Sequence, residues 1–356
     1  MNQEAILISR SIEAVSNALA QWVVERHAEA DPTLAERYEG NWRSNWVANV
    51  HARLTYLAQA VAVRCPAVFS ESVLWNREAI VAREGRVEDL TASLNHMRAV
   101  IANELPALEA RAATECIDAA IVATAKARSS QFVDAANLPS RDVVLQYLEC
   151  LLMSKRAEAI ELVLNLARSG TPITSLYIDV LQPAQAEVGR MWHRNEISVA
   201  DEHYATAVTQ EVMSRLREFA QPGTPRHLGV VAASVGGDFH ELGIRMVADC
   251  FELDGWAVTY LGANLPAVEA VRVVQESKAQ VLAISASTFL HLREVGSLID
   301  AMRAAPAGAN VKIIVGGPPF NLIPELWVEL GADGCATSAV DAVSLAGRLV
   351  SNAACD

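Results

Sequence analysis

Two groups of residues in this sequence have the types and spacing that metal chemistry needs. The first lies in "DFHELG", where Asp238, His240 and Gly243 form the pattern D-x-H-x-x-G. A neutral imidazole is a common metal ligand, and a carboxylate nearby can accept the other ring N–H, which fixes the tautomer and strengthens the ligand nitrogen. We therefore predict that His240 binds a metal and that Asp238 orients its ring.

The second group stands in "MWHRNEISVADEHYATAV", where Trp192 is followed, after nine residues, by the adjacent pair Glu202 and His203. A mostly apolar helical segment has no structural need for such a pair. Ser198, with Asp201 three residues later, resembles a capping box and predicts that a helix begins there. Glu202 and His203 would then lie near the start of that helix.

The segment after residue 225 must position the first group. It alternates short β-branched runs ("LGVVAA", "AVTYL", "VLAIS", "VKIIV") with helical periods and ends in "GADGCATSAVDAVSLAGRLV". This alternation predicts an α/β fold, a doubly wound parallel sheet of five strands, buried on both faces. Ligands of such sheets bind at the carboxyl ends of the strands, at a topological switch point. The small residues predicted at that end are Ser285 and Ser287 after strand three, and Gly316 and Gly317 after strand four.

The rest of the chain reads as helical. Residues 141–220 contain four apolar-periodic segments with short connections, which predict a four-helix bundle. Residues 1–128 predict an all-helical N-terminal domain of five helices, and 129–140 a linker. The first helix is marked by Ile8, Ile12, Val15, Leu19 and Trp22, and the second by Tyr38, Trp42 and Trp46. The predicted domains are 1–128, 141–220 and 225–356.

Composition limits the classes of function. Hydrophobic residues make up 52% and charged residues 20%, so the chain can bury a sizeable core. The net charge of -13 argues against direct DNA binding, which depends on Lys and Arg at phosphates. The longest apolar runs are shorter than the roughly 18 residues of a membrane span. Six cysteines, without a C-x-x-C, fit a reduced, cytoplasmic protein.

The pattern D-x-H-x-x-G, then a serine after strand three, then Gly-Gly, resembles the cobalamin-binding domain of methionine synthase, mutases and corrinoid proteins. The resemblance covers roughly 225–350 and includes "ELDGWAVTYLGANLP". It implies that His240 is the lower cobalt ligand and that the cofactor's nucleotide tail passes Gly243, Ser285 and Gly316. Ser287 and Gly317 are further candidate cofactor-binding residues. It also implies that the bundle, 141–220, covers the upper face of the corrin.

Trp192, nine residues, then Glu202 and His203 is similar to a pattern of cobalamin photoreceptors related to light-dependent repressors of carotenoid genes. That resemblance implies adenosylcobalamin, with Trp192 packed against the adenosyl group and Glu202 hydrogen-bonded to it. His203 would take the cobalt after light has removed the group. No helix-turn-helix precedes the bundle here, so we expect no direct DNA binding.

A helical domain ahead of such a module resembles the photocobilins, which hold cobalamin and a bilin, biliverdin. The aromatic-rich first domain would then hold the bilin, and Trp42, Trp46 and His51 are its candidate contacts. Core packing is the alternative explanation of the aromatic residues. The resemblance further implies a homo-oligomer, a dimer or tetramer with light-dependent assembly, which signals to an unidentified downstream protein.

Three functions remain open on the sequence. The first is a photosensory protein, not an enzyme, that uses adenosylcobalamin and a bilin. The second is a corrinoid methyl-carrier protein of a cobalamin-dependent methyltransferase system, for which the bundle, the sheet and His240 suffice. The third is a haem or bare-tetrapyrrole sensor, which the intact D-x-H-x-x-G disfavours.

Overall fold

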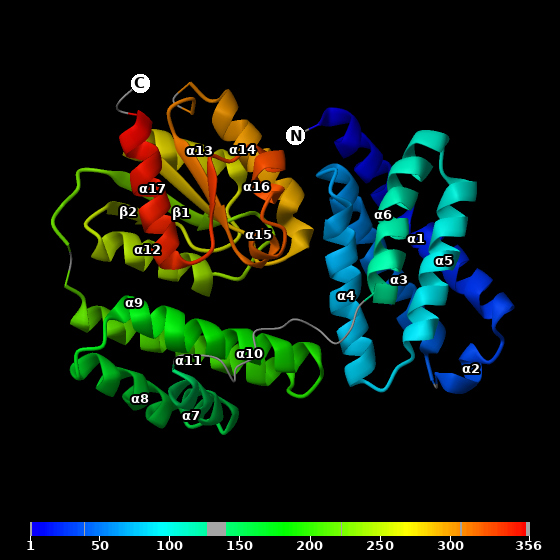
Figure 1. Ribbon diagram of the computed structural model, residues 1–356, viewed down its shortest axis with the longest axis horizontal. Coiled ribbons are helices and arrows are strands. Elements are labelled where there is room, and N and C mark those ends of the chain that lie inside the picture. Colours follow the sequence, from blue (N-terminus) through cyan, green and yellow to red (C-terminus); the bar gives the residue numbers. More distant parts are fainter. Residues whose placement is uncertain (1, 39, 127–139, 222, 307, 354–356) are drawn as a thin grey trace. The chain divides into compact units, whose positions relative to one another are not determined.

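The computed structural model describes residues 2–38, 40–126, 140–221, 223–306 and 308–353 (Figure 1). The chain divides into two compact units. The first comprises Met1–Ser130, Ala286–Asp300 and Pro318–Gly331, and the second comprises Gln131–Ser285, Ala301–Gly317 and Ala332–Asp356. The predicted linker, 129–140, lies outside the described residues except for Ser140.

The N-terminal part of the first unit is helical throughout the residues that the structure describes. Its core consists of fully buried Ile12, Leu19, Leu57, Phe69 and Leu94. The helices are α1 (Gln3–Ala30), α2 (Leu34–Arg37), α3 (Trp42–Ala62), α4 (Pro66–Ala82), α5 (Val87–Glu104) and α6 (Ala107–Lys126). The five predicted helices are present, and the single turn α2 is additional.

One detail of the N-terminal prediction was wrong. Tyr38 is not in the helix of Trp42 and Trp46, because Tyr38 has an extended backbone and Gly40 a φ of +67°, which together end the helical path before α3 begins. The predicted first helix is present as α1, in which Val15 and Trp22 are 38% and 43% exposed. Beside its large apolar side chains, the buried face of α1 includes small and polar residues: Ala5, Ser9, Ser16, Ala20 and His27.

The bundle of the second unit is built from α7 (Arg141–Leu152), α8 (Arg156–Arg168), a continuous helical run over 173–193, and α11 (Val199–Leu216). The run is not uniform. It consists of α9 (Ile173–Leu176), a π-helical stretch η2 (Tyr177–Leu181) and α10 (Gln182–His193). The short 3₁₀ helix η3 (Arg217–Phe219) follows α11. The predicted start of α11 is confirmed, because Ser198 and Asp201 form both hydrogen bonds of a capping box.

The sheet has five parallel strands in the order β2-β1-β3-β4-β5, as predicted for a doubly wound fold. The strands are β1 (Gly229–Ser234), β2 (Ala257–Tyr260), β3 (Val281–Ser285), β4 (Lys312–Gly316) and β5 (Gly334–Ala336). The connecting helices are α12 (Leu242–Leu253), α13 (Ala267–Ser277), η4 (Phe289–His291), α14 (Leu292–Ala304), α15 (Pro318–Leu322), α16 (Leu326–Leu330) and α17 (Ala339–Ala353). The expectation that every strand is buried on both faces was wrong for β2, an edge strand whose residues are half-buried or exposed.

Helix α12 joins the bundle to the sheet within the second unit. Met246 and Cys250, on one side of it, belong to the apolar core of the bundle. Ile244, Ala248 and Phe251, on its other side, pack with the strands. Both sides of α12 are therefore fixed, and the loop that leads into it is positioned by both layers.

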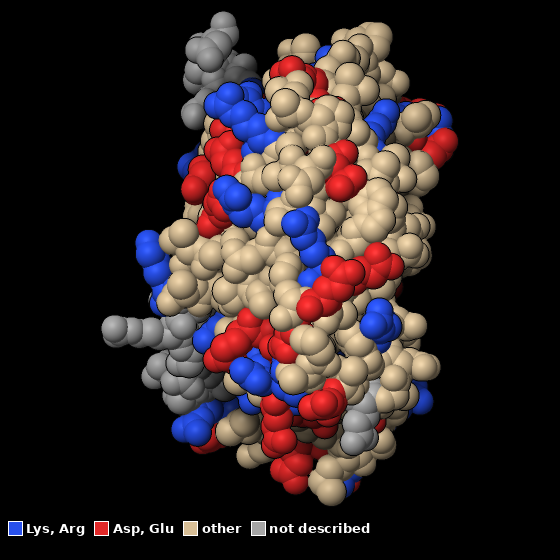
Figure 2. All heavy atoms as spheres, turned by 90° about the vertical axis from the view of Figure 1, so that its right-hand side faces the viewer, with Lys and Arg blue, Asp and Glu red and all other residues tan. Residues whose placement is uncertain are grey.

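Charged side chains are intermingled on the face of the protein drawn in Figure 2, where Lys and Arg lie among Asp and Glu and wide uncharged areas. Among the described residues, no helix is both long enough and apolar enough to cross a membrane.

Candidate functional site

His240 lies in the loop between β1 and α12, at the carboxyl edge of the sheet, and this loop fixes its ring. The ring Nδ1 lies 2.8 Å from Oδ1 of Asp238, which also accepts the His240 backbone N–H at 3.0 Å. Ser234, the last residue of β1, donates its hydroxyl to the His240 carbonyl at 2.8 Å. Asp238 is fully buried, whereas the His240 side chain is 66% exposed. With Nδ1 held by Asp238, Nε2 is the nitrogen that remains for a ligand.

The electrostatic surroundings of His240 include the bundle. The hydrogen bond to Asp238 raises the pKa of His240, burial opposes that shift, and the charge of Glu202 adds to it. Glu202 belongs to α11, so this effect brings a residue of the second predicted group close to the first. The structure thus places Glu202 of the second group within electrostatic range of His240.

The loop itself is held by its neighbour between β2 and α13. Gly237 has a φ of +84° and donates its N–H to the side chain of Asn264 at 2.7 Å, while Asn264 donates its own N–H to the carbonyl of Asp238 at 2.9 Å. A side chain at Gly237 would be strained in that conformation. These contacts hold His240 in place.

The carboxyl ends of the central strands carry small residues. Ser234, Ser285 and Gly316 are register partners across β1, β3 and β4. A Cβ atom at Gly316 would lie 3.1 Å from the carbonyl oxygen of Ala336, whereas one at Gly243 would meet nothing within 4 Å. Open space at Gly243 is what the predicted passage of a ligand past that residue requires.

Gly317 directly follows β4 and has a φ of +113°. Ser287 follows β3 by two residues and belongs to the first unit, so the structure does not relate it to His240.

Glu202 and His203 lie near the start of α11, as predicted. Nδ1 of His203 is 2.6 Å from Oε2 of Glu202, and Thr206 donates to the other carboxylate oxygen at 3.0 Å. The His203 side chain is 75% exposed. Glu202 therefore orients the imidazole and leaves Nε2 directed away from the pair.

Trp192 lies one residue before the end of α10 and is 46% exposed, so it is not part of the bundle core. Helix α10 is tied to α11 by Gln185, which donates to Thr209 at 2.7 Å and to the carbonyl of Ala205 at 3.2 Å. An indole left exposed beside such a fixed helix pair is available to a ligand.

The candidate bilin residues have different partners among the described residues. Trp46 is buried and packs edge-on against His27, at 5.1 Å between ring centroids, and against Tyr38, at 5.5 Å. Trp42 instead lies under the guanidinium of Arg43, at 5.0 Å. His51 is half-buried on α3.

His27 was not singled out from the sequence. It is buried, and its ring centroid lies 5.0 Å from that of His96. Its Nδ1 has no partner among the described residues. The sequence signal was weak, because His27 stands far along the chain from its neighbours Trp46 and His96.

Comparisons with known proteins match the bundle and the sheet segment of the chain. Residues 228–344 match the family model of a B12 binding domain, and residues 144–217 match a second B12 binding domain model. Dimethylamine corrinoid protein 3 of Methanosarcina acetivorans is 24% identical over 204 residues, covering 57% of this chain and 94% of the relative. A corrinoid protein of Desulfitobacterium hafniense is 28% identical over 168 residues, covering 46% and 76%.

Among solved structures, the monomethylamine corrinoid protein of Methanosarcina barkeri aligns with a TM-score of 0.53 at 20% identity, covering 59% of this chain and 99% of that one. At this identity the likeness concerns the fold. The relatives favour the corrinoid methyl-carrier protein over the photosensory protein. Both family models match residues after the N-terminal helices.

Proposed function

The chain is a cobalamin-binding protein, and from that premise we propose that it is a corrinoid carrier, the methyl-carrying component of a cobalamin-dependent methyltransferase system. The observation that supports this best is the geometry of His240, whose Nδ1 is held by buried Asp238 while its ring remains exposed. The relatives named as corrinoid proteins support the same function.

The residues present fit the lower side of a corrinoid. His240 would hold the cobalt through Nε2, and Asp238 would keep the ring in the required tautomer. The open space at Gly243 and the small residues Ser285 and Gly316 at the strand ends leave room for the nucleotide tail. We extend this proposed lining to Ser287 and Gly317. Bound cobalamin would supply a cobalt ion that carries a transferable group on its upper face.

The test uses hydroxocobalamin and the full chain. We expect the wild type to bind it with the absorption spectrum of histidine-ligated cobalt, and His240→Ala to bind it more weakly with a different spectrum. Asp238→Asn should weaken binding by about 10-fold to 100-fold, as for other residues that orient a metal ligand. His227→Ala, at an exposed histidine of the same unit, is the control. An unchanged spectrum in His240→Ala would contradict the assignment.

A second function, light sensing, is favoured by one specific observation. The imidazole of His203 is oriented by Glu202, is largely exposed, and stands on the helix whose Glu202 influences the pKa of His240. A carrier does not need such a pair. In this alternative Trp192 and Glu202 would contact an adenosyl group of the bound cobalamin, and His203 would supply a second imidazole for the cobalt after illumination.

Illumination separates the two functions. The protein loaded with adenosylcobalamin in the dark is exposed to green light, and its absorption is recorded before and after. A light sensor should convert to a spectrum of cobalt bound by two histidines, which His203→Ala abolishes and His193→Ala, a nearby helix-end histidine, retains. A product spectrum that His203→Ala leaves unchanged would remove this alternative. Acceptance of a methyl group from a partner methyltransferase, in light or dark, would support the carrier.

Three further expectations accompany the light sensor. The N-terminal helices would bind biliverdin, with Trp42, Trp46 and His51 as contacts, and a far-red absorption band on adding biliverdin tests this. Homo-oligomers, dimers or tetramers, would assemble in a light-dependent way, which gel filtration in dark and light tests. The signal would pass to a downstream protein partner.

A further inference from the structure

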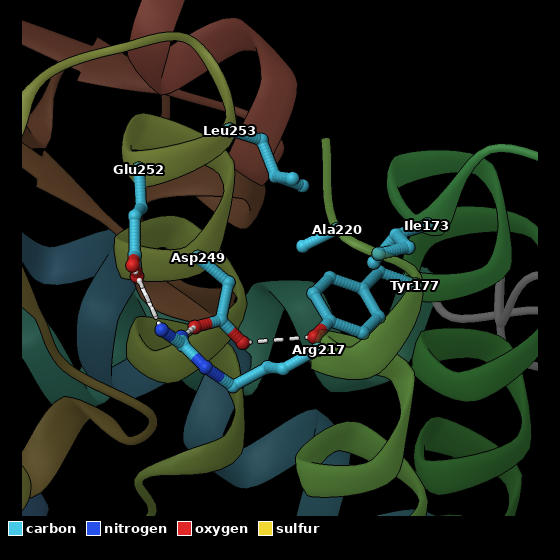
Figure 3. A pocket seen from close by; sticks show the side chains of 7 residues that line it. All are labelled: Ile173, Tyr177, Arg217, Ala220, Asp249, Glu252 and Leu253. Atoms are coloured by element: carbon cyan, nitrogen blue, oxygen red, sulfur yellow. Dashed lines mark hydrogen bonds and ion pairs between the residues drawn. The ribbon is translucent and has the colours of Figure 1, made fainter. Parts of the chain in front are cut away.

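A buried carboxylate on α12 connects three elements of the second unit. Asp249 accepts a hydrogen bond from the hydroxyl of Tyr177 at 2.8 Å, and its other oxygen lies 2.6 Å from Nη1 of Arg217 (Figure 3). Arg217 also reaches Glu252 at 2.8 Å. Burial and the charge of Asp249 raise the pKa of Tyr177. The phenol therefore stays protonated and remains a donor to Asp249.

The three elements lead to the two groups of the candidate site. Tyr177 opens the π-helical stretch of the run that ends beyond Trp192. Arg217 follows α11, which begins three residues before Glu202. Helix α12 begins two residues after His240. The Asp249 carboxylate thus links α12, which follows the His240 loop, to the helical run that carries Trp192 and to α11, which carries the Glu202–His203 pair.

Asp249 also makes the last of three regularly spaced contacts between the α11–η3 segment and α12 with its N-cap residue, Glu241. Glu241 accepts from Gln210 at 2.7 Å, and Arg245 donates to Ser214 at 2.8 Å. With Asp249 and Arg217 these contacts recur every three or four residues on both helices. The first contact, at Gln210, lies seven residues after His203. About 10 Å of α11 therefore separates His203 from the nearest of these contacts.

A pocket opens to the surface beside Asp249. It has a volume of about 210 Å³ and is lined by the seven side chains shown in Figure 3: Ile173, Tyr177, Arg217, Ala220, Asp249, Glu252 and Leu253. The Arg217 side chain is 47% exposed, so its ion pair with buried Asp249 is half open to solvent. Ion pairs of exposed side chains contribute little to stability, so a role in fixing geometry gives a reason for this one.

We propose that Asp249 is a positioning residue that sets where α10 and α11 stand relative to the His240 loop, and thereby how accessible the upper face of bound cobalamin is. This rests on the proposed cobalamin site. Tyr177 transmits the constraint to the run over 173–193, and Arg217 transmits it to α11.

The first experiment needs no cofactor. Hydrogen–deuterium exchange of the full apo chain is compared among wild type, Asp249→Asn, Tyr177→Phe and Arg217→Gln. Tyr177→Phe should speed exchange in 173–193, Arg217→Gln in the second half of α11, and Asp249→Asn in both, by about fivefold or more. Tyr147→Phe is the matched control. It removes a buried hydroxyl contact of similar length, 2.9 Å to Thr209, that lies within the bundle.

The second experiment measures access to the cobalt. The full chain is loaded with hydroxocobalamin, and the rate of cyanide binding is followed by absorption. Asp249→Asn and Tyr177→Phe should raise the rate by about fivefold or more while the histidine-ligated spectrum is retained, and Tyr147→Phe should leave the rate unchanged. If Asp249→Asn and Tyr177→Phe bind cyanide at the wild-type rate and show unchanged hydrogen–deuterium exchange, the proposal is overturned. A wild type that takes up no hydroxocobalamin would refute the proposed function instead, and the exchange experiment alone would then decide the role of Asp249.

Discussion

Two glycines show how differently single residues can matter in this fold. Gly255 has a φ of +90°, and a Cβ there would lie 2.2 Å from the carbonyl oxygen of Thr224, whereas Gly243 has open space. We predict that Gly255→Ala lowers the free energy of unfolding by more than about 2 kcal/mol, because backbone and not a flexible side chain blocks the Cβ. Urea denaturation measures this.

Gly243→Ala is the control for Gly255→Ala. It should leave the free energy of unfolding within about 0.5 kcal/mol of the wild type. It should nevertheless weaken hydroxocobalamin binding if the tail passes there. Equal destabilisation by both substitutions would mean that neither the clash nor the open space is as described.

The lowered pKa values of two histidines predict how the stability of the N-terminal helices depends on pH. Burial lowers the pKa of both His27 and His96 from the usual 6.5. The neighbouring His96 ring lowers the pKa of His27 further, whereas Asp89 and Asp31 raise it. The unfolded chain therefore binds protons at a pH at which the folded chain does not. Above pH 6.5 the neutral rings of His27 and His96 contribute fully to the stability of the folded chain. This contribution is lost as the pH falls below 6.5.

Thermal denaturation between about pH 7.5 and about pH 5.5 tests this expectation. The positively charged neighbours of the pair are Arg37 near His27 and Arg26 near His96, and both disfavour protonation as well. His96→Gln should reduce the loss of stability on acidification, and exposed His227→Ala should not. A wild type more stable at the lower pH would contradict the prediction.

At the scale of single residues, the sequence predicted local chemistry and missed distant contacts. Asp238 and His240 could be paired because only one residue separates them, and the hydrogen bond is present. Asp249 could not be linked to Tyr177 and Arg217, because these stand 72 and 32 residues away and only the packing of α12 against the bundle brings them together.

At the scale of elements, the start of α11 decides where the Glu202–His203 pair stands. Ser198 accepts the backbone N–H of Asp201, and Asp201 accepts that of Ser198. We predict that Ser198→Ala costs about 1 kcal/mol of stability, the typical value of a lost N-cap. Fraying of the first turn should also reduce any light-dependent ligation by His203. Ser344→Ala, at an exposed position within α17, is a control for helix propensity but not for capping.

The elements themselves were largely predictable. Alternating strand and helix periods gave the parallel sheet in its observed form, and the capping box gave the start of α11. The break between Tyr38 and Trp42 was missed because a spacing of four residues fits a helix whether or not the backbone continues through Gly40. The π-helical stretch was missed because apolar periodicity does not resolve one widened turn.

At the scale of the whole molecule, cofactor binding should be visible as stability. A ligand that binds only the folded chain stabilises it by about 2.7 kcal/mol at 100 times its Kd. We predict that hydroxocobalamin raises the thermal midpoint of the wild type and raises that of His240→Ala less at the same concentration. Equal shifts in both would mean that the corrinoid binds without His240.

The widened turn over Tyr177–Leu181 has a consequence for comparing sequences. A π-helical turn holds one residue more than an α-helical turn, so a chain that lacks one residue here can continue as a regular α-helix with α10 in the same orientation. Trp192 would then keep its direction. A homologue whose alignment shows a one-residue gap there can therefore present the same indole to the same side of the bundle.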